Sequence, residues 1–406
     1  MSSQLLIAAR PYLQLCSVLT LTLPPNFHTL SEQRRRRLLS IFACYTLLIL
    51  AIGGYVTYIN ILGVYFEIKL YKLEEFTNVL GVMHSIFYTI LLAAIHLNML
   101  LQYRRLGSLY VDIAQVERDI FKATQPYKDF TSVLSFRWRL ALNSGLLMVF
   151  LVVTYSYILV PLLAKSFTLH EQILTVFILG LLQLKCVEYC VFVQLIQELI
   201  LSLKRQLQQL QREMEDCGEN DALLQALCSA LRLNQLLLLR VWALVGELEA
   251  YFMLPMVLLF FSNGATIFYT VNWVYIQSPN PNDCCRYWRP CIILVLLVNL
   301  FVPCWLTQCC INSYNSFSNM LHSVEHGNSR MLIMRLREYA LQLQHLKLLF
   351  TCGGLFDINL KFFAGLIATI STYVIILIQF KMQADIEAKQ ATNNAANSHV
   401  PFLPFR

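Results

Sequence analysis

Polar side chains are spaced two helical turns apart inside the last strongly apolar stretch of the chain, residues 358–380. Thr372 and Gln379 lie there, and each is followed by an aromatic residue, Tyr373 and Phe380. At about 3.6 residues per turn, the two polar groups share nearly one face and the two rings share the adjacent face. An amide at membrane depth is costly beside lipid, so we expect Gln379 to face protein or a water-filled path.

Charged and histidine residues inside the apolar segments are a second group that could form an ion pair or bind a ligand. Lys185 and Glu188 are three residues apart within residues 172–197, so they can pair on one helix face. We expect an internal structural pair, and an ion-path or ligand role is the alternative. His84 and His96 are about three turns apart without a nearby carboxylate or cysteine, so the sequence predicts no metal site and no cofactor.

The elements that position these groups are membrane helices. The chain has 406 residues, is 57% hydrophobic and only 14% charged, which is typical of a multi-pass membrane protein. Continuous apolar runs without strand-like alternation predict an all-α fold. Seven stretches are long enough to cross a bilayer: residues 41–62, 79–101, 140–162, 172–197, 249–271, 290–311 and 358–380.

The segments between the crossings are expected to be partly structured. Leucine stripes predict a helical extension over residues 198–248, with a break at 217–220, and a helical anchor over residues 312–357 that ends at a Gly353-Gly354 break. These helices form either an oligomer-forming domain or a bundle within one chain. The tail, residues 381–406, is polar and is predicted to be mobile.

Basic residues are distributed unevenly along the chain. The N-terminal segment, residues 1–40, and the second, fourth and sixth loops hold 21 of the 31 Lys and Arg, whereas the opposite loops and the tail hold 8. By the positive-inside rule, the N-terminus is cytoplasmic and the C-terminus extracellular. This orientation disfavours a G-protein-coupled receptor. The four arginines at residues 34–37 are a topology anchor or an anionic-lipid site.

Two further features concern processing and redox state. The apolar stretch at residues 5–23 is interrupted by Arg10-Pro11 and lacks a convincing cleavage site, so no cleavable signal peptide is expected. Most of the 13 cysteines lie in apolar segments, where free Cys acts as a small hydrophobe. Cys284 and Cys285 lie between crossings, and whether either forms a disulfide stays open.

The pattern Thr372-Tyr373, five apolar residues, Gln379-Phe380 resembles the terminal signature of insect gustatory receptors. Residues 340–345 and 350–359, the latter including Cys352-Gly353-Gly354, are similar to the segment that precedes the last helix in that family. The resemblance implies a ligand-gated, non-selective cation channel in the plasma membrane of gustatory neurons.

The family also implies an assembly: a homo- or hetero-tetramer with other gustatory receptor subunits, each giving its last helix to a central pore in the lipid bilayer. Gln379 and Phe380 would lie at the gate, with Thr372 and Tyr373 packing against neighbouring helices. Helix packing for all four residues is the alternative. Val374 stands where the sugar-sensing subgroup tends to carry an acidic residue, which favours a bitter or aversive small-molecule tastant, with acceptance or avoidance as the behaviour.

The family's ligand pocket lies in the outer half of the earlier helices. Candidate lining residues here are His84, Phe87, Tyr88, Tyr155, Tyr157, Phe268, Tyr269 and Trp273. Aromatic residues near membrane edges also form interfacial belts, which is the alternative for each.

A seven-helix receptor that signals through a cytoplasmic partner is the alternative function. Motifs such as HExxH and GxSxG are absent, so we expect no enzyme, and no nucleic-acid partner is expected.

Overall fold

The computed structural model describes residues 3–71, 75–123, 131–164, 166–216, 221–277, 287–323 and 330–398. Within these ranges the chain is helical and contains no strand, so the predicted all-α fold is confirmed there. The elements are α1 Gln4–Val18, η1 Phe27–Thr29, α2 Glu32–Tyr71, α3 Glu75–Leu101, α4 Tyr103–Ala123, α5 Thr131–Leu140, the π-helical turn η2 Ala141–Gly145, α6 Leu146–Leu163, α7 Leu169–Asp216, α8 Asp221–Gln277, α9 Trp288–Ser323, α10 Arg330–His345 and α11 Leu360–Ser398.

Seven spans in the described chain are long and apolar enough to cross a membrane, and each overlaps one predicted crossing. They are Glu32–Lys69, Asn78–Leu101, Val133–Leu163, Leu169–Met214, Asp221–Val274, Trp288–His322 and Leu360–Ala391. The predicted number of membrane helices, seven, is therefore confirmed. Cys284, Cys285 and the break at 217–220 lie outside the described residues.

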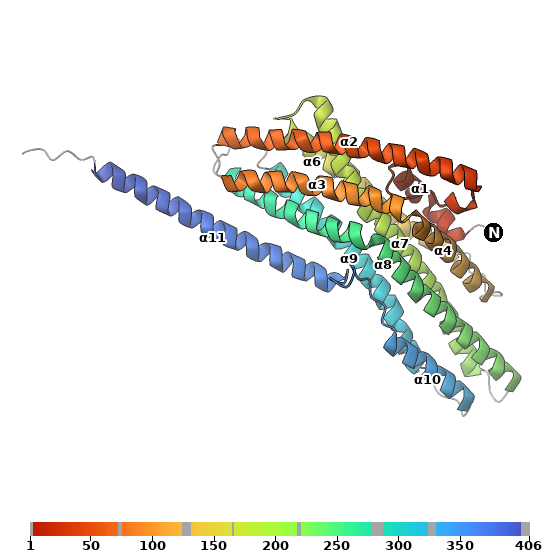
Figure 1. The fold of residues 1–406 in the computed structure, drawn as a ribbon. Helices are drawn as coiled ribbons and strands as arrows, with labels where there is room; N and C mark the ends of the chain where they lie inside the picture. The colour runs from red at the N-terminus through yellow and green to blue at the C-terminus, as the bar shows by residue number, and fades with distance from the viewer. Residues whose placement is uncertain are drawn as a thin grey trace, which may run out of the picture.

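Helix α7 is the centre of the bundle (Figure 1). In its most apolar window 83% of the residues are buried, because Leu, Ile, Val and Cys occupy all sides of the helix. It packs against α1, α6, α8 and α9, while α2 and α3 form a neighbouring pair alongside. This central position places any polar residue of α7 deep inside the protein.

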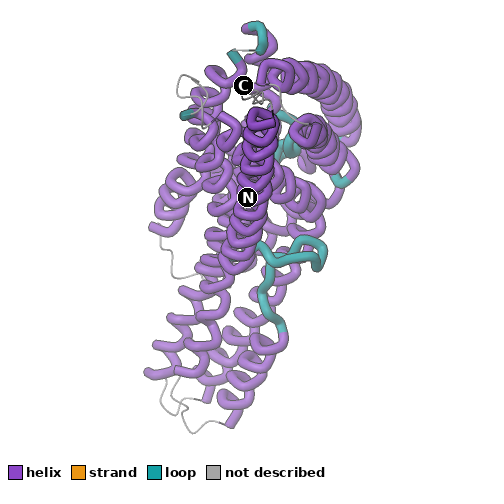
Figure 2. The backbone as a smooth tube through the Cα atoms, turned by 90° about the vertical axis from the view of Figure 1, so that its left-hand side faces the viewer, coloured by secondary structure: helices purple, strands orange, loops and turns teal. Residues whose placement is uncertain are grey.

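The ends of α7 and α9 and the start of α8 continue past the bundle and form a narrower arm with α10 (Figure 2). Asn234 stabilises the arm: its amide donates to the Leu203 carbonyl at 3.0 Å and to Gln206 Oε1 at 2.9 Å. The Tyr339 hydroxyl of α10 donates back to Asn234 Oδ1 at 2.8 Å. The leucine stripes thus pack into a helical bundle within one chain.

The N-terminal segment is part of the bundle. Helix α1 runs through Pro11, so the interruption expected there does not break the helix. Burial of Leu5, Ala9 and Leu13 against the bundle compensates the backbone hydrogen bond that proline cannot make. Glu117 of α4 accepts from the backbone N–H groups at the start of α1, and burial raises the pKa of this carboxyl although those hydrogen bonds oppose the shift.

A tight loop precedes the last helix. Gly353 and Gly354 have φ of +60° and +74°, a conformation that favours glycine, and Thr351 and Asp357 form an isolated bridge around them. The predicted break is therefore confirmed as a turn. Helix α11 then leaves the bundle at an angle (Figure 1).

The mobile tail predicted after residue 380 is wrong for residues 381–398, because α11 continues to Ser398. This part holds five alanines together with Gln and Lys, which have high helix propensity, and the preceding membrane helix supplies its nucleus. Residues 399–406 lie outside the described residues.

Candidate functional site

The motif residues of α11 lie on a helix with little cover from its own chain. No residue of its most apolar 18-residue window is buried. Phe380 is 69% exposed and Tyr373 60%, and Thr372 and Gln379 are exposed as well. The Thr372 hydroxyl donates to the Ala368 carbonyl of its own helix at 2.9 Å. The gate and packing roles of these four residues stay predictions.

Aromatic rings attach the start of α11 to α8. Phe356 in the preceding loop stacks on Phe362, with centroids 4.1 Å apart, and Phe260 of α8 meets the edge of both at 5.9 and 5.4 Å. Asn359 caps the helix by accepting from the Phe362 N–H at 2.8 Å. Phe260 thus holds the first turn of α11 against α8.

A chain of polar side chains crosses the interior of the bundle, with Thr266 of α8 at one end. The Thr266 hydroxyl donates to the Ser262 carbonyl at 2.7 Å. Tyr88 OH and His84 Nε2, both on α3, each lie 3.0 Å from Thr266 Oγ1. Because the single Thr266 proton is already used, Tyr88 and His84 act as the donors, which assigns the proton of His84 to Nε2.

The chain continues to α7 and α9 through Gln183. Its amide donates to Asn263 Oδ1 at 3.0 Å, and it accepts from Asn263 at 3.2 Å and from Asn299. Tyr155 of α6 lies within hydrogen-bonding reach of Tyr88 and Gln183. Gln183 thus joins Asn263 of α8 and Asn299 of α9 by hydrogen bonds across helices. We name the following set the buried polar network: His84, Tyr88, Tyr155, Gln183, Asn263, Thr266 and Asn299.

Aromatic and charged side chains close the network at one end. Tyr269 stacks on His84 at 4.5 Å, and Trp273 meets Tyr269 edge-on at 6.3 Å. The Arg289 guanidinium lies 4.7 Å from the Trp273 ring and 3.5 Å from the Glu67 carboxylate. A cation–π contact and an ion pair thus cap this end of the site.

The structure brings five of the predicted pocket residues together, namely His84, Tyr88, Tyr155, Tyr269 and Trp273. The other three lie apart. Phe87 packs on Phe261, which is 55% exposed, and Tyr157 is 67% exposed against Trp288. Phe268 is half-buried and its ring makes none of the described aromatic contacts.

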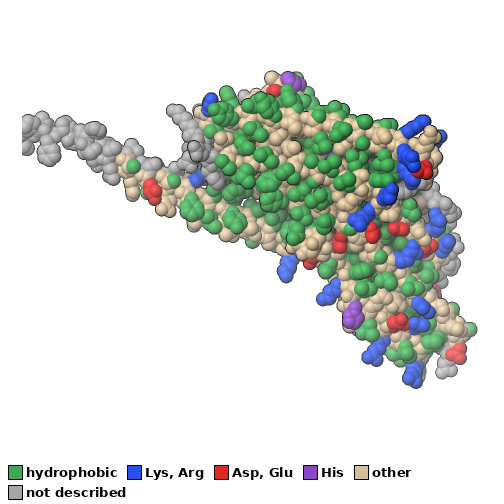
Figure 3. All heavy atoms as spheres, in the orientation of Figure 1, with side chains coloured by type: hydrophobic (Ala, Val, Ile, Leu, Met, Phe, Trp, Pro, Cys, Tyr) green, Lys and Arg blue, Asp and Glu red, His purple; other side chains and the backbone are tan. Residues whose placement is uncertain are grey.

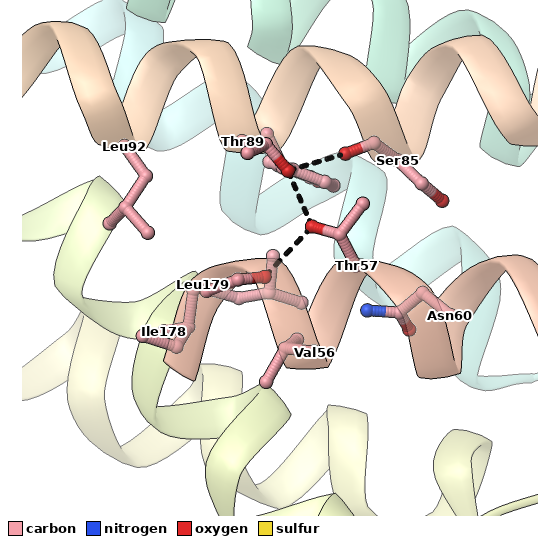
Figure 4. Close-up of a pocket in the computed structure, with 10 residues that line it drawn as sticks. Val56, Thr57, Asn60, Ser85, Thr89, Leu92, Ile178 and Leu179 are labelled. Carbon is pink, nitrogen blue, oxygen red and sulfur yellow. Dashed lines mark hydrogen bonds between the residues drawn. The ribbon is translucent and has the colours of Figure 1, made fainter. Parts of the chain in front are cut away.

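A small cleft between α2, α3 and α7 reaches Tyr88 (Figure 4). The hydroxyls of Thr57 on α2 and Thr89 on α3 are hydrogen-bonded to each other, and each also lies within donor distance of a carbonyl of its own helix, Gly53 at 2.9 Å and Ser85 at 3.5 Å. Asn60 lines the same cleft. These residues are not among the pocket residues predicted from the sequence, although a threonine and an asparagine inside one apolar stretch are a signal for an interior polar surface.

Lys185 is fully buried on α7, two residues from Gln183 of the network. Its Nζ donates to Glu188 Oε2 at 2.6 Å and to the Leu21 carbonyl at 3.1 Å. The ring centroids of Tyr251 and Phe252 lie 4.9 Å away. The predicted internal pair is confirmed, and it also ties the segment after α1 to the central helix.

The chain is similar to known proteins over most of its length. The family model described as 7tm Chemosensory receptor matches residues 9–384. The chain is 46% identical over 388 residues to "Putative gustatory receptor 98b" of Drosophila melanogaster, covering 94% of this chain and 96% of the relative. It is 42% identical over 389 residues to "Putative gustatory receptor 98c" of the same organism, covering 94% and 95%.

Solved structures share the fold. The insect olfactory receptor OR5 from Machilis hrabei has a TM-score of 0.59 over 83% of this chain and 89% of that chain. Its complex with eugenol has a TM-score of 0.62 over 92% and 99%, and both are 14% identical to this chain. The resemblance to gustatory receptors drawn from the terminal motif is confirmed. The chain belongs to the 7tm chemosensory receptor family, as a multi-pass chemoreceptor and not an enzyme.

Proposed function

We propose that the chain is a subunit of a ligand-gated cation channel that opens when a small tastant binds the buried polar network. The observation that carries the proposal is α11, an apolar helix with no buried residue in its central window and with an exposed glutamine at depth. Lipid is a poor environment for that amide. An assembly in which several copies of α11 surround a water-filled axis would place the amide in a more favourable, polar environment.

The gate follows from the two residues at the end of the motif. In a tetramer, whether of this subunit alone or mixed with others, Phe380 supplies an apolar ring that excludes water when narrow. Gln379 supplies amides beside it that hydrate cations when the ring widens. Thr372 and Tyr373 pack between subunits in the same assembly.

Charge supports an orientation with the arm in the cytoplasm. Figure 3 shows Lys and Arg gathered over the start of α2, α4 and the arm, whereas the face over α2 and α3 towards the opposite end is largely hydrophobic. By the positive-inside rule the basic end is cytoplasmic, and α11 runs towards the outside. The expected location is the plasma membrane of gustatory neurons.

The chemistry of the site suits a small aromatic ligand. Ring faces of Tyr269 and Trp273 offer stacking, and the hydroxyls and amides of the network offer hydrogen bonds. The relative of the same fold solved with eugenol supports a ligand of that size. Together with Val374 in the motif, this favours a bitter or aversive compound.

The network can be tested at Tyr88. Replacing Tyr88 by phenylalanine removes one donor to Thr266, and a net loss of about 1 kcal/mol raises the half-maximal agonist concentration about fivefold. The measurement is a dose response to an agonist found by screening small bitter aromatics. Tyr157→Phe is the matched control, because Tyr157 is 67% exposed and should leave the dose response unchanged. Equal effects of both changes would remove Tyr88 from the site.

The channel and its orientation are tested together. Epitopes before Met1 and after Arg406 are probed with antibody in intact and permeabilised cells, and cation currents are recorded from the same cells. We expect only the C-terminal epitope to be reached in intact cells, with currents that require the chain. Access to only the N-terminal epitope, without current, would favour a receptor that signals through a cytoplasmic partner.

A further inference from the structure

One charged hydrogen bond joins α8 to α11 directly after the motif. Lys381 follows Phe380, and its Nζ donates to Asn272 Oδ1 at 2.6 Å. Asn272 is fully buried beside Trp273, whereas Lys381 is half-buried. Hydrogen bonds to an ionised group are about twice as strong as neutral ones, and shielding from water strengthens them further.

This bond is the outer of two attachments that hold α11 to α8. The inner one is the aromatic group of Phe260, Phe356 and Phe362 at the start of α11. Between them, Leu366 and Ile370 pack against the bundle, whereas Thr372, Tyr373, Gln379 and Phe380 are exposed. The outer attachment lies two residues from Gln379, within the part of the helix assigned to the gate.

The bond also sets the rotation of α11. Two residues along an α-helix turn its side chains by about 200°, so Gln379 and Lys381 point to nearly opposite sides. Because Lys381 is held against α8, Gln379 points away from its own bundle, towards the position of a central axis. The ammonium group meanwhile points away from that axis, where it does not oppose the passage of cations.

Asn272, which accepts the hydrogen bond from Lys381, lies on α8 close to residues of the buried polar network. Thr266, Tyr269 and Asn272 lie within two turns of one another, and Trp273 is the residue after Asn272. A ligand that enters between His84 and Tyr269 must displace α8 or its side chains, because these rings are already in contact at 4.5 Å. Such a displacement reaches Asn272 through rigid helix.

We propose that the Asn272–Lys381 hydrogen bond is a latch of the ligand-free state, which couples the buried polar network to the gate and breaks when the channel opens. The proposal rests on the proposed function, since it assumes that α11 lines a pore. A bond made only in the closed state favours that state by its own strength, so removing it shifts the equilibrium towards opening.

The test is the resting current, carried by Cs⁺ without any ligand and normalised to the number of subunits at the cell surface. Lys381→Met should raise the open-to-closed ratio about tenfold, as expected for the loss of a hydrogen bond to a charged group. Asn272→Leu should do the same, and the double variant should exceed neither single variant, because both remove one interaction. Lys389→Met is the matched control: Lys389 is exposed further along the same helix and should leave the current unchanged.

A second variant covers the case in which Asn272→Leu does not reach the surface. Asn272→Asp keeps an acceptor and adds a charge opposite Lys381, so the resting current should fall below that of the unaltered chain. Surface-expressed Lys381→Met with an unchanged resting current, or additive effects in the double variant, would overturn the latch. If neither the unaltered chain nor Phe380→Ala conducts at the surface, the channel proposal itself has failed.

Discussion

Replacement of Lys185 by methionine is expected to destabilise the fold by about 3–5 kcal/mol, because it leaves the Glu188 carboxylate buried without its cation. Both side chains are 0% exposed, and Nζ and Oε2 are 2.6 Å apart. The Leu21 carbonyl loses a donor in the same variant. For a chain of this length such a loss lowers the midpoint of thermal unfolding by roughly 5 °C, measured on protein extracted in mild detergent.

Two further variants separate a structural from an ion-path role of this pair. Lys185→Met combined with Glu188→Leu should recover most of the stability, because apolar residues of similar volume often replace a buried ion pair without loss. Lys122→Met is the matched control, since Lys122 is exposed on α4 and should leave the midpoint unchanged. A stable double variant with altered cation selectivity would assign the pair to an ion path.

At the gate, Phe380→Ala is expected to raise the ligand-independent cation current by at least about tenfold, because a wider and less apolar ring no longer excludes water. Phe380 is 69% exposed within its own chain, so the substitution removes no intramolecular core contact and should not reduce surface expression. The measurement is the resting current per surface subunit in the absence of ligand.

The control for this prediction lies on another helix. Leu47 of α2 is 67% exposed, so Leu47→Ala removes a similarly exposed apolar side chain outside α11 and should leave the resting current unchanged. Gln379→Leu removes the amide beside the constriction and should change conductance or gating with normal surface expression. Unchanged currents from surface-expressed Phe380→Ala and Gln379→Leu would place the gate elsewhere.

The predictions for the Asn272–Lys381 latch and for the Phe380 gate concern one closed-to-open equilibrium. If the Asn272–Lys381 hydrogen bond holds the closed state, Lys381→Met and Phe380→Ala act on the same equilibrium at adjacent residues of α11. The aromatic attachment at Phe260 then serves as the fixed end about which α11 moves. The tastant site and the pore would thus communicate through α8.

Local patterns in the sequence determined the membrane helices of this protein, its buried ion pair and the turn before its last helix. The seven crossings follow from run length and apolar composition, since only helices satisfy their own backbone in a bilayer. The Lys185–Glu188 pair follows from three-residue spacing on one helix, and the Gly353-Gly354 turn follows from residue type. Each of these depends on neighbours in the chain.

The tertiary structure decided which side chains meet across helices. Tyr155 and Tyr157 are two residues apart and equally aromatic, yet one lies in the buried polar network and the other is 67% exposed. Lipid and protein interior are similarly apolar, so hydrophobicity does not distinguish the inward face of a membrane helix from the outward one. The rotation and crossing of each helix settle that choice, as they do for the contact of Lys381 with Asn272.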